Sequence, residues 1–353
     1  MFEKSTWIRL PRNVVVGHEV LGETATVLEE THLAGRPLVV TSPTPKQVAG
    51  DDLVADLREA GYDPALVVVE ESSFEAVESV LEVAADADPD FLMGVGGGKP
   101  IDIAKMAAEK LSVGFVSIPT AASHDGIVSG RGSVPQGDTR HSVAAAPPIA
   151  VIADTGVIAD APWELMTAGM ADIISNYTAV KDWKLANRLK NVAYSEYAGA
   201  LSQMTAELLR DAAPSIKRGL EESAWIVVKA LVSSGVAMSI AGSSRPASGA
   251  EHLFSHQLDR IAPGRALHGH QVGVGAILTE YLHSGEGGEW EAVRDALDSV
   301  GAPTTAAELD LSEAEVIEAL TSAHEIRDRY TILGDGIEDA AAVEAARRTG
   351  VVG

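Results

Sequence analysis

Short apolar runs alternate with amphipathic stretches along the first half of the chain. Runs rich in Val, Ile, Leu and Phe predict strands at residues 13–16, 37–41, 65–70, 91–95, 115–119 and 149–153. Between them, stretches such as 46–60 and 73–84 have the apolar spacing of helices. This alternation predicts a parallel sheet with helices on both faces. Residues 129–145 interrupt it, and their Gly, Ser, Arg and Val content predicts a hairpin or an irregular loop.

The pattern changes after residue 154, where Val-rich runs give way to long stretches rich in Ala, Leu and Glu. These predict helices at residues 162–190, 193–212, 223–243, 247–258 and 267–283. A chain of 353 residues also exceeds the size at which one core keeps growing. We therefore expect an α/β domain at residues 1–155 and an all-α domain at residues 156–353.

The chain contains no cysteine. Disulfides, thiolate nucleophiles and cysteine-bound zinc are therefore excluded. Any metal ion must be held by His, Asp or Glu side chains and by water.

The acidic balance of the chain excludes some partners. There are 51 acidic and 27 basic residues, ten of the latter lysines, and the net charge is −24. Such a chain should repel nucleic acid and anionic membranes. The composition favours a protein adapted to high salt, where repulsion between like charges is screened. The alternative is an acidic protein without such adaptation. Apolar runs such as 64–69 are too short to span a membrane, and residues 1–6 lack a signal pattern, so we expect a cytoplasmic protein.

A glycine run follows the predicted strand 91–95. Gly96, Gly97 and Gly98 precede Lys99 and Pro100, and a helical pattern follows. Glycines let backbone N–H groups approach a phosphate closely, and the start of a helix favours negative charge. Because the run departs from the G-x-G-x-x-G fingerprint, an ordinary tight turn is the alternative.

A second polar loop, residues 119–126, follows the next strand. Its hydroxyls could line the same crevice, at the carboxyl ends of the strands. Asp125 could accept a hydrogen bond from a substrate hydroxyl. The alternative is that Ser123 or Asp125 caps a helix.

Four of the ten histidines lie between residues 252 and 270. Ser248 and Glu251 have the spacing of a capping box, so a helix starting at Ser248 would place His252 and His256 one turn apart on one face. A catalytic metal site needs about three protein ligands. The acid Asp172, within an apolar helical stretch, could join the histidines, because burying a lone carboxylate is costly. Taken singly, each histidine could equally be an ordinary core or surface residue.

Five motifs in this order resemble the archaeal glycerol-1-phosphate dehydrogenase family, within the superfamily of iron-containing alcohol dehydrogenases, glycerol dehydrogenases and dehydroquinate synthases. They are Gly-Gly-Gly-Lys-Pro-Ile-Asp at 96–102, Ser-Ile-Pro-Thr-Ala-Ala-Ser-His-Asp-Gly at 117–126, Gly-Met-Ala-Asp at 169–172, Ser-Gly-Ala-Glu-His-Leu-Phe-Ser-His at 248–256 and Leu-His-Gly-His-Gln-Val-Gly at 267–273. The resemblance implies a dehydroquinate synthase-like fold, with a Rossmann-like domain, a helical domain and Zn²⁺ between them.

The resemblance also implies roles for particular residues. Asp172, His252 and His268 would hold the metal, and Asp125, Asp172 and His256 would contact the substrate. His270 is an alternative ligand. The residues implied for NAD(H) or NADP(H) are Gly98, Lys99, Pro100, Ile101, Asp102, Thr120, Ala121, Ala122, Ser123 and Ser129. No cluster of Arg or Lys along the sequence marks a phosphate site for the substrate.

The activity implied is NAD(P)H-dependent reduction of dihydroxyacetone phosphate to sn-glycerol 1-phosphate for archaeal phospholipid biosynthesis. We expect both cofactors to be used, because no acid ends the second strand, where Thr41, Ser42 and Lys46 could tolerate a 2′-phosphate. Glycerol dehydrogenase and a dehydroquinate synthase-like lyase are the enzyme alternatives, and a non-enzymatic nucleotide- or metal-binding protein is a third. We expect a small-molecule substrate and a homo-oligomeric assembly. We expect neither nucleic-acid binding nor membrane-spanning segments.

Overall fold

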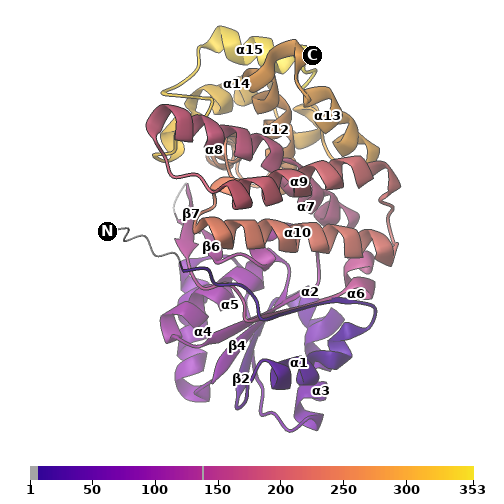
Figure 1. Ribbon diagram of the computed structural model, residues 1–353. Helices are drawn as coiled ribbons and strands as arrows, with labels where there is room; N and C mark the ends of the chain where they lie inside the picture. The colour runs from indigo at the N-terminus through magenta and orange to yellow at the C-terminus, as the bar shows by residue number, and fades with distance from the viewer. Residues whose placement is uncertain (1–6, 137–138) are drawn as a thin grey trace.

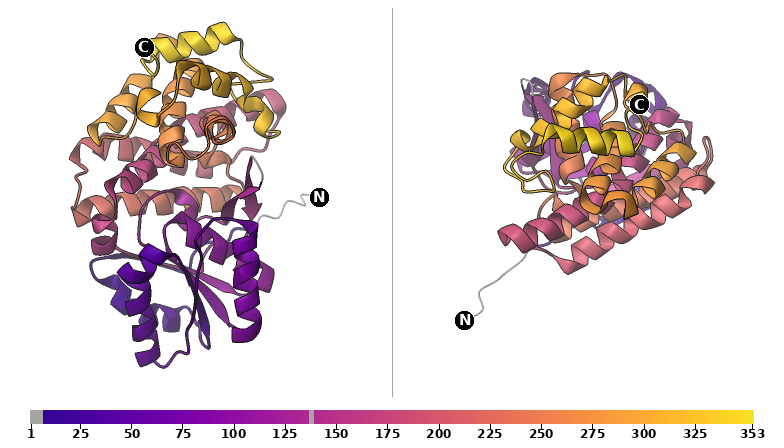
Figure 2. Two further views of the ribbon diagram at one scale, coloured as in Figure 1. Left: turned by 180° about the vertical axis from the view of Figure 1, so that it is seen from behind. Right: turned by 90° about the horizontal axis from the view of Figure 1, so that it is seen from above.

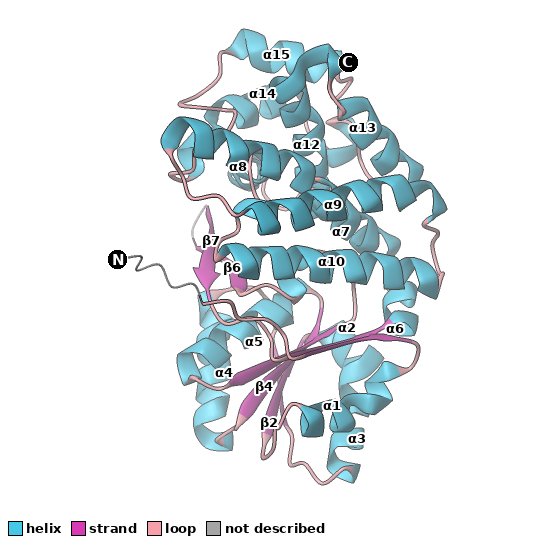
Figure 3. Cartoon of the chain, viewed as in Figure 1, coloured by secondary structure: helices cyan, strands magenta, loops and turns pink. Residues whose placement is uncertain are grey.

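The computed structural model describes residues 7–136 and 139–353. Strands are confined to one half of the molecule, and helices alone build the other half (Figures 1 and 3). The view from behind shows the same division (Figure 2). This is the predicted fold class, an α/β half followed by an all-α half. The predicted boundary after residue 155 stays a prediction, and residues 1–6, where no signal pattern was expected, lie outside the described residues.

The first half is built on a parallel six-stranded sheet with the order β1-β8-β5-β4-β2-β3. Its strands are β1 (Asn13–Gly17), β2 (Pro37–Thr41), β3 (Ala65–Val68), β4 (Phe91–Gly96), β5 (Gly114–Pro119) and β8 (Ala150–Asp154). All six match predicted strands. The third is two residues shorter than predicted.

Helices cover both faces of this sheet. They are α1 (Thr24–Glu30), α2 (Pro43–Pro45), α3 (Asp51–Glu59), α4 (Phe74–Ala87), α5 (Gly98–Leu111) and α6 (Thr155–Asp160). The predicted helix 46–60 begins with a π-helical turn at Lys46–Gly50 and continues as α3. Helix α4 begins where predicted, because the Ser73 hydroxyl accepts a hydrogen bond from the Ala76 N–H at 3.1 Å.

Alternate residues of each central strand enter different cores. Val39 and Met93 pack in one core with apolar residues of α1 and α3. Leu38, Val40 and Leu92 face the opposite way and pack with α4 and α5. The second core continues without a break into the helical half. The two halves are therefore held together by shared apolar packing.

The interruption at residues 129–145 is an antiparallel hairpin of β6 (Arg131–Gln136) and β7 (Thr139–Ala144). One of the two predicted alternatives is thereby confirmed. In Figure 1 the hairpin rises from the sheet toward the helical half.

Nine helices are described in the second half. They are α7 (Trp163–Ile174), α8 (Asn176–Lys190), α9 (Glu196–Ala212), α10 (Glu221–Ala241), α11 (Ala250–Ile261), α12 (His268–Ser284), α13 (Trp290–Ser299), α14 (Glu313–Ser322) and α15 (Asp339–Arg348). Shorter helical turns lie at Val20–Glu23, Asp125–Ile127, Ala213–Ser215, Arg245–Ala247, Gly285–Gly287, Ala307–Leu309 and Ala323–Ile326.

One predicted helix is divided in the structure, and the predicted start of another is wrong. The predicted helix 162–190 is divided at Ser175, a buried residue between α7 and α8. Helix α11 begins at Ala250 and not at Ser248, and its cap has no side-chain hydrogen bond. Glu251 does not close a capping box. Its carboxylate accepts hydrogen bonds from the Gly249 N–H and from His252.

Helix α10 is the one helix among the described residues that is long and apolar enough to cross a membrane, by length and composition alone. It lies against the sheet half in Figure 1. Its Ser234 hydroxyl donates to Asp125 of the sheet half at 2.7 Å, so one face of α10 contacts that half. Tyr197, Met204 and Leu208 are exposed on α9. The homo-oligomer stays a prediction.

Candidate active site

A cavity of about 440 Å³ lies between the two halves and collects the candidate residues. The sheet half contributes the start of α5 and the loop after β5, including Gly98 and Asp125. The helical half contributes Asp172, His252 and His268. The glycine loop and the histidine cluster, far apart in sequence, therefore face a single space.

Glycines in β4 and at the start of α5 let these two elements pack very close to their neighbours. A Cβ at Gly94 would lie 2.9 Å from the Ile101 Cα, and one at Gly98 would lie 1.9 Å from His124 Nε2. Gly96 has φ +145°, which favours glycine. Gly97 differs, because a Cβ there would meet nothing within 4 Å. Its missing side chain leaves open space beside the start of α5.

The residues predicted to bind the cofactor divide into two groups. Those that line the cavity are Gly98, Lys99, Asp102, Ser123 and Ser129. Those that are buried and absent from its lining are Pro100, Ile101, Thr120, Ala121 and Ala122. The Asp102 carboxylate accepts hydrogen bonds from Lys105 at 3.1 Å and from the Ser133 N–H at 3.0 Å, so it also ties α5 to β6.

Gly97→Val is expected to raise the KM for NADH at least about tenfold while leaving the fold and the metal content unchanged. Gly97 has φ −79° and open space at its Cβ, so valine should fit the protein and exclude only the cofactor. Steady-state kinetics and fluorescence titration with NADH measure the effect. Gly287→Val, at another open position, is the control. Unchanged NADH affinity in Gly97→Val would show that the loop is only structural.

Asp172, His252 and His268 form a compact group of possible metal ligands. One side-chain ligand atom from each lies within 4.8 Å of the others. His252 Nε2 is 3.4 Å from Asp172 Oδ1. The three come from α7, α11 and α12. A carboxylate and two imidazoles suit a divalent transition metal that keeps open positions for substrate.

Two glycines bring α7 and α12 close enough to build this group. A Cβ at Gly269 would lie 2.0 Å from the Ala168 carbonyl oxygen, so glycine lets the start of α12 pack on α7. Gly169 likewise has the Ala122 carbonyl oxygen 2.0 Å from its Cβ position. These close approaches fix His268 beside Asp172, and α7 beside the loop after β5.

Hydrogen bonds orient both histidines of this candidate ligand group. His252 Nδ1 donates a hydrogen bond to the Glu251 carboxylate at 3.0 Å. The Ser255 hydroxyl donates to Gln271 Oε1 at 2.7 Å, so it accepts from His268 Nδ1 at 2.8 Å. In both rings Nε2 can then present its lone pair to a metal. Sequence reasoning did not identify these positioning roles of Glu251, Ser255 and Gln271.

Metal binding at His252 is expected to depend on pH, because the ring must lose a proton before it can bind a metal. Burial lowers the pKa of His252, but hydrogen bonds to Asp172 and Glu251 outweigh it and raise the pKa to about 9. A metal must displace this proton, so metal affinity should rise with pH up to about pH 9.

His270 and His256 occupy different surroundings. The Thr167 hydroxyl donates to the Glu164 carbonyl oxygen and accepts from His270 Nε2 at 2.9 Å. Burial lowers the pKa of His270 to about 4. His270 lies outside the candidate ligand group, although the sequence analysis named it as an alternative metal ligand. His256 lines the cavity, and its ring stacks on that of His268 with centroids 5.6 Å apart.

Asp125, in the sheet half, is held beside the candidate metal group by hydrogen bonds to two residues of the helical half. Its N–H donates to Asp172 Oδ2 at 3.1 Å, and Ser234 donates to its Oδ2 at 2.7 Å. Asn176 donates in turn to Ser234. Burial and the negative charge of Asp172 raise the pKa of Asp125 to about 7. The helical turn here is capped by His124, whose Nδ1 accepts from the Gly126 N–H, and not by Ser123 or Asp125.

The end of β2 carries no acidic residue, as the sequence indicates. The Thr41 hydroxyl is buried and donates to the Val95 carbonyl oxygen at 2.9 Å. Lys46 forms an ion pair with Asp51 at 2.5 Å. Three residues were named as possible neighbours of a cofactor 2′-phosphate. The hydroxyl of Thr41 already forms a hydrogen bond within the protein, so Ser42 and Lys46 remain the candidates.

Comparisons with known proteins agree with this architecture. Residues 15–162 match the iron-containing alcohol dehydrogenase family. The chain is 76% identical to glycerol-1-phosphate dehydrogenase [NAD(P)+] of Halobacterium salinarum and 75% identical to that of Natronomonas pharaonis, covering 100% of each chain. Its structure is similar to glycerol dehydrogenase from Schizosaccharomyces pombe, with a TM-score of 0.79 at 19% identity, over 99% of this chain and 94% of the other.

The two kinds of comparison carry different weight. At 19% identity, the likeness to the solved structure shows the fold alone. Identity of 75–76% over the full length shows the family, and its halophilic archaeal sources fit the acidic, lysine-poor composition. The chain therefore belongs to the glycerol-1-phosphate dehydrogenase [NAD(P)+] family.

Proposed function

We propose that this protein reduces dihydroxyacetone phosphate to sn-glycerol 1-phosphate with NADH or NADPH, and so supplies the backbone of archaeal phospholipids. The observation that carries the proposal is the cavity that joins the glycine loop to the Asp172, His252 and His268 group. The relatives' name, glycerol-1-phosphate dehydrogenase [NAD(P)+], supports the substrate and both cofactors.

We propose Zn²⁺ as the metal held by Asp172, His252 and His268. The donor set fits, because the ligand atoms are close together and Nδ1 of each histidine makes the hydrogen bond that orients its ring, which assigns metal binding to Nε2. Hydride transfer requires no redox change at the metal, which suits zinc. When bound, the metal supplies Lewis-acid polarisation of a carbonyl group.

The sheet half is proposed to bind the cofactor. The pyrophosphate would lie at the N-terminus of α5, near Gly98 and Lys99, where backbone N–H groups and the helix dipole favour negative charge. Residues 120–123 and Ser129 would place the nicotinamide ring beside the metal group. When bound, the cofactor supplies the hydride.

Asp125 and His256 are proposed to orient the substrate. Ser234 occupies one oxygen of the Asp125 carboxylate, and the other can accept the C1 hydroxyl of the substrate. His256 lines the same cavity and can pass a proton toward the developing alkoxide, directly or through water. A ketone held by these contacts would show a single face to the cofactor.

The experiment that tests this function compares substrates in high salt. NADH oxidation is measured with dihydroxyacetone phosphate, dihydroxyacetone and glyceraldehyde 3-phosphate. Dihydroxyacetone phosphate should have by far the highest kcat/KM. Equal or better turnover of dihydroxyacetone would instead identify a glycerol dehydrogenase.

A further inference from the structure

Several arginines gather around one wall of the cavity. Arg131 on β6 and Arg327, which follows the turn Ala323–Ile326, both line it. Arg329 lies close enough to Arg327, Arg131 and Arg245 for their charges to act on it. Burial and the charge of Arg131 lower the pKa of Arg327. Burial and the charges of Arg327, Arg245 and Arg131 lower the pKa of Arg329. Positive charge is therefore concentrated here, in a protein of net charge −24.

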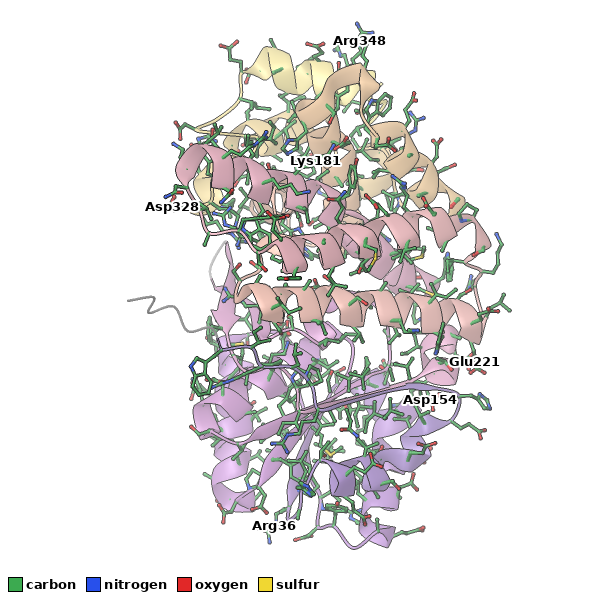
Figure 4. The ribbon with its side chains drawn as sticks, viewed as in Figure 1. Arg36, Asp154, Lys181, Glu221, Asp328 and Arg348 are labelled. Atoms are coloured by element: carbon green, nitrogen blue, oxygen red, sulfur yellow. The ribbon has the colours of Figure 1, made fainter. Side chains whose placement is uncertain are left out.

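These arginines differ in the hydrogen bonds that their guanidinium groups donate within the protein. Arg329 donates to the Ser248 carbonyl oxygen and to the Ser244 hydroxyl. Arg245 donates to the Tyr330 carbonyl oxygen at 3.3 Å. Arg327 is partly buried, and no described residue forms a hydrogen bond or an ion pair with its guanidinium. The next residue in sequence, Asp328, is exposed and lies at the outer edge of the molecule (Figure 4).

The segment that carries Arg327 is fixed to the helix that carries a metal ligand. The buried carboxylate of Asp182 accepts hydrogen bonds from the Ala250 N–H at 2.7 Å and the Ile332 N–H at 2.6 Å. Ala250 is the first residue of α11, which carries His252. Asp182 therefore joins the segment after Arg327 to the start of α11, and Arg327 has a defined position relative to the metal group.

We propose that Arg327 binds the phosphate group of the substrate, with the charge of Arg131 adding to its attraction. A guanidinium matches two phosphate oxygens at once, and a partly buried cation without a counter-ion is stabilised by an incoming dianion. The inference rests on the proposed function and deepens it. It supplies the phosphate site that no Arg or Lys cluster marks in the sequence.

The test compares two substrates in the wild type, Arg327→Gln and Arg327→Lys. In Arg327→Gln, kcat/KM for dihydroxyacetone phosphate should fall about tenfold to a hundredfold, the range for losing hydrogen bonds to a charged group. Turnover of dihydroxyacetone and the KM for NADPH should stay within about twofold of wild type, which also shows that the variant folds. Arg327→Lys should recover part of the loss. Arg347→Met, which removes an exposed arginine on α15, should leave the preference intact.

Failure of this inference is distinguishable from failure of the proposed function. If the wild type prefers dihydroxyacetone phosphate and Arg327→Gln retains that preference, Arg327 does not bind the phosphate. A raised KM for NADPH with the preference unchanged would overturn the inference too, by assigning the arginine to the cofactor. If the wild type itself shows no preference for the phosphorylated ketone, the proposed function fails.

Discussion

Replacing His268 with alanine is expected to remove nearly all bound zinc and to lower kcat at least about a thousandfold. Two protein ligands, Asp172 and His252, would remain, and such a site holds metal poorly. A Lewis acid at a developing alkoxide contributes several kcal/mol, and about 1.4 kcal/mol corresponds to a factor of ten in rate. Metal analysis of the purified variant, together with steady-state kinetics, measures both losses.

The matched control is His270→Ala, two residues away on the same helix. His270 Nε2 donates to Thr167, outside the ligand group, so this variant should keep its zinc and most of its activity. The opposite pattern, with full zinc in His268→Ala and none in His270→Ala, would contradict the assignment.

Asp125→Asn is expected to keep zinc and cofactor but to lose about tenfold to a hundredfold in kcat/KM. Asparagine has nearly the same shape, and its carbonyl oxygen can still accept the hydrogen bond from Ser234. What is lost is the negative charge that would accept the substrate hydroxyl, an interaction worth roughly 1.5–3 kcal/mol. Kinetics, zinc content and NADH titration separate these effects.

Asp160→Asn makes the same change of charge at an exposed residue at the end of α6, and should behave as wild type. If Asp125→Asn retains full kcat/KM, Asp125 has no part in orienting the substrate. If it loses zinc, its main contribution is to the metal group.

Local pattern was sufficient for the strands and for most helices. Parallel strands buried on both faces are continuous apolar runs, and all six were found at nearly the predicted positions. Boundaries failed where tertiary contacts decide. Glu251 has the spacing of a capping box, but its carboxylate accepts hydrogen bonds from His252 and from the Thr178 hydroxyl of α8, 73 positions away. A single sequence cannot show that competition.

The proximity of the candidate metal ligands could also be predicted from the sequence. The ligand group Asp172, His252 and His268 is brought together as the resemblance implies. Residues acting from a distance could not be predicted. Ser234 reaches Asp125 across 109 positions of sequence, and Arg327 shares a cavity wall with a residue of β6. No local spacing marks such pairs, because only the packing of the two halves creates them.

Chiral analysis of the product tests the central claim most directly. Zinc and a nicotinamide cannot by themselves choose between the two faces of a ketone, so the product's configuration reports how the cavity holds the substrate's two ends. Wild-type protein supplied with dihydroxyacetone phosphate and NADPH in high salt should form sn-glycerol 1-phosphate alone. Predominance of sn-glycerol 3-phosphate would contradict the account.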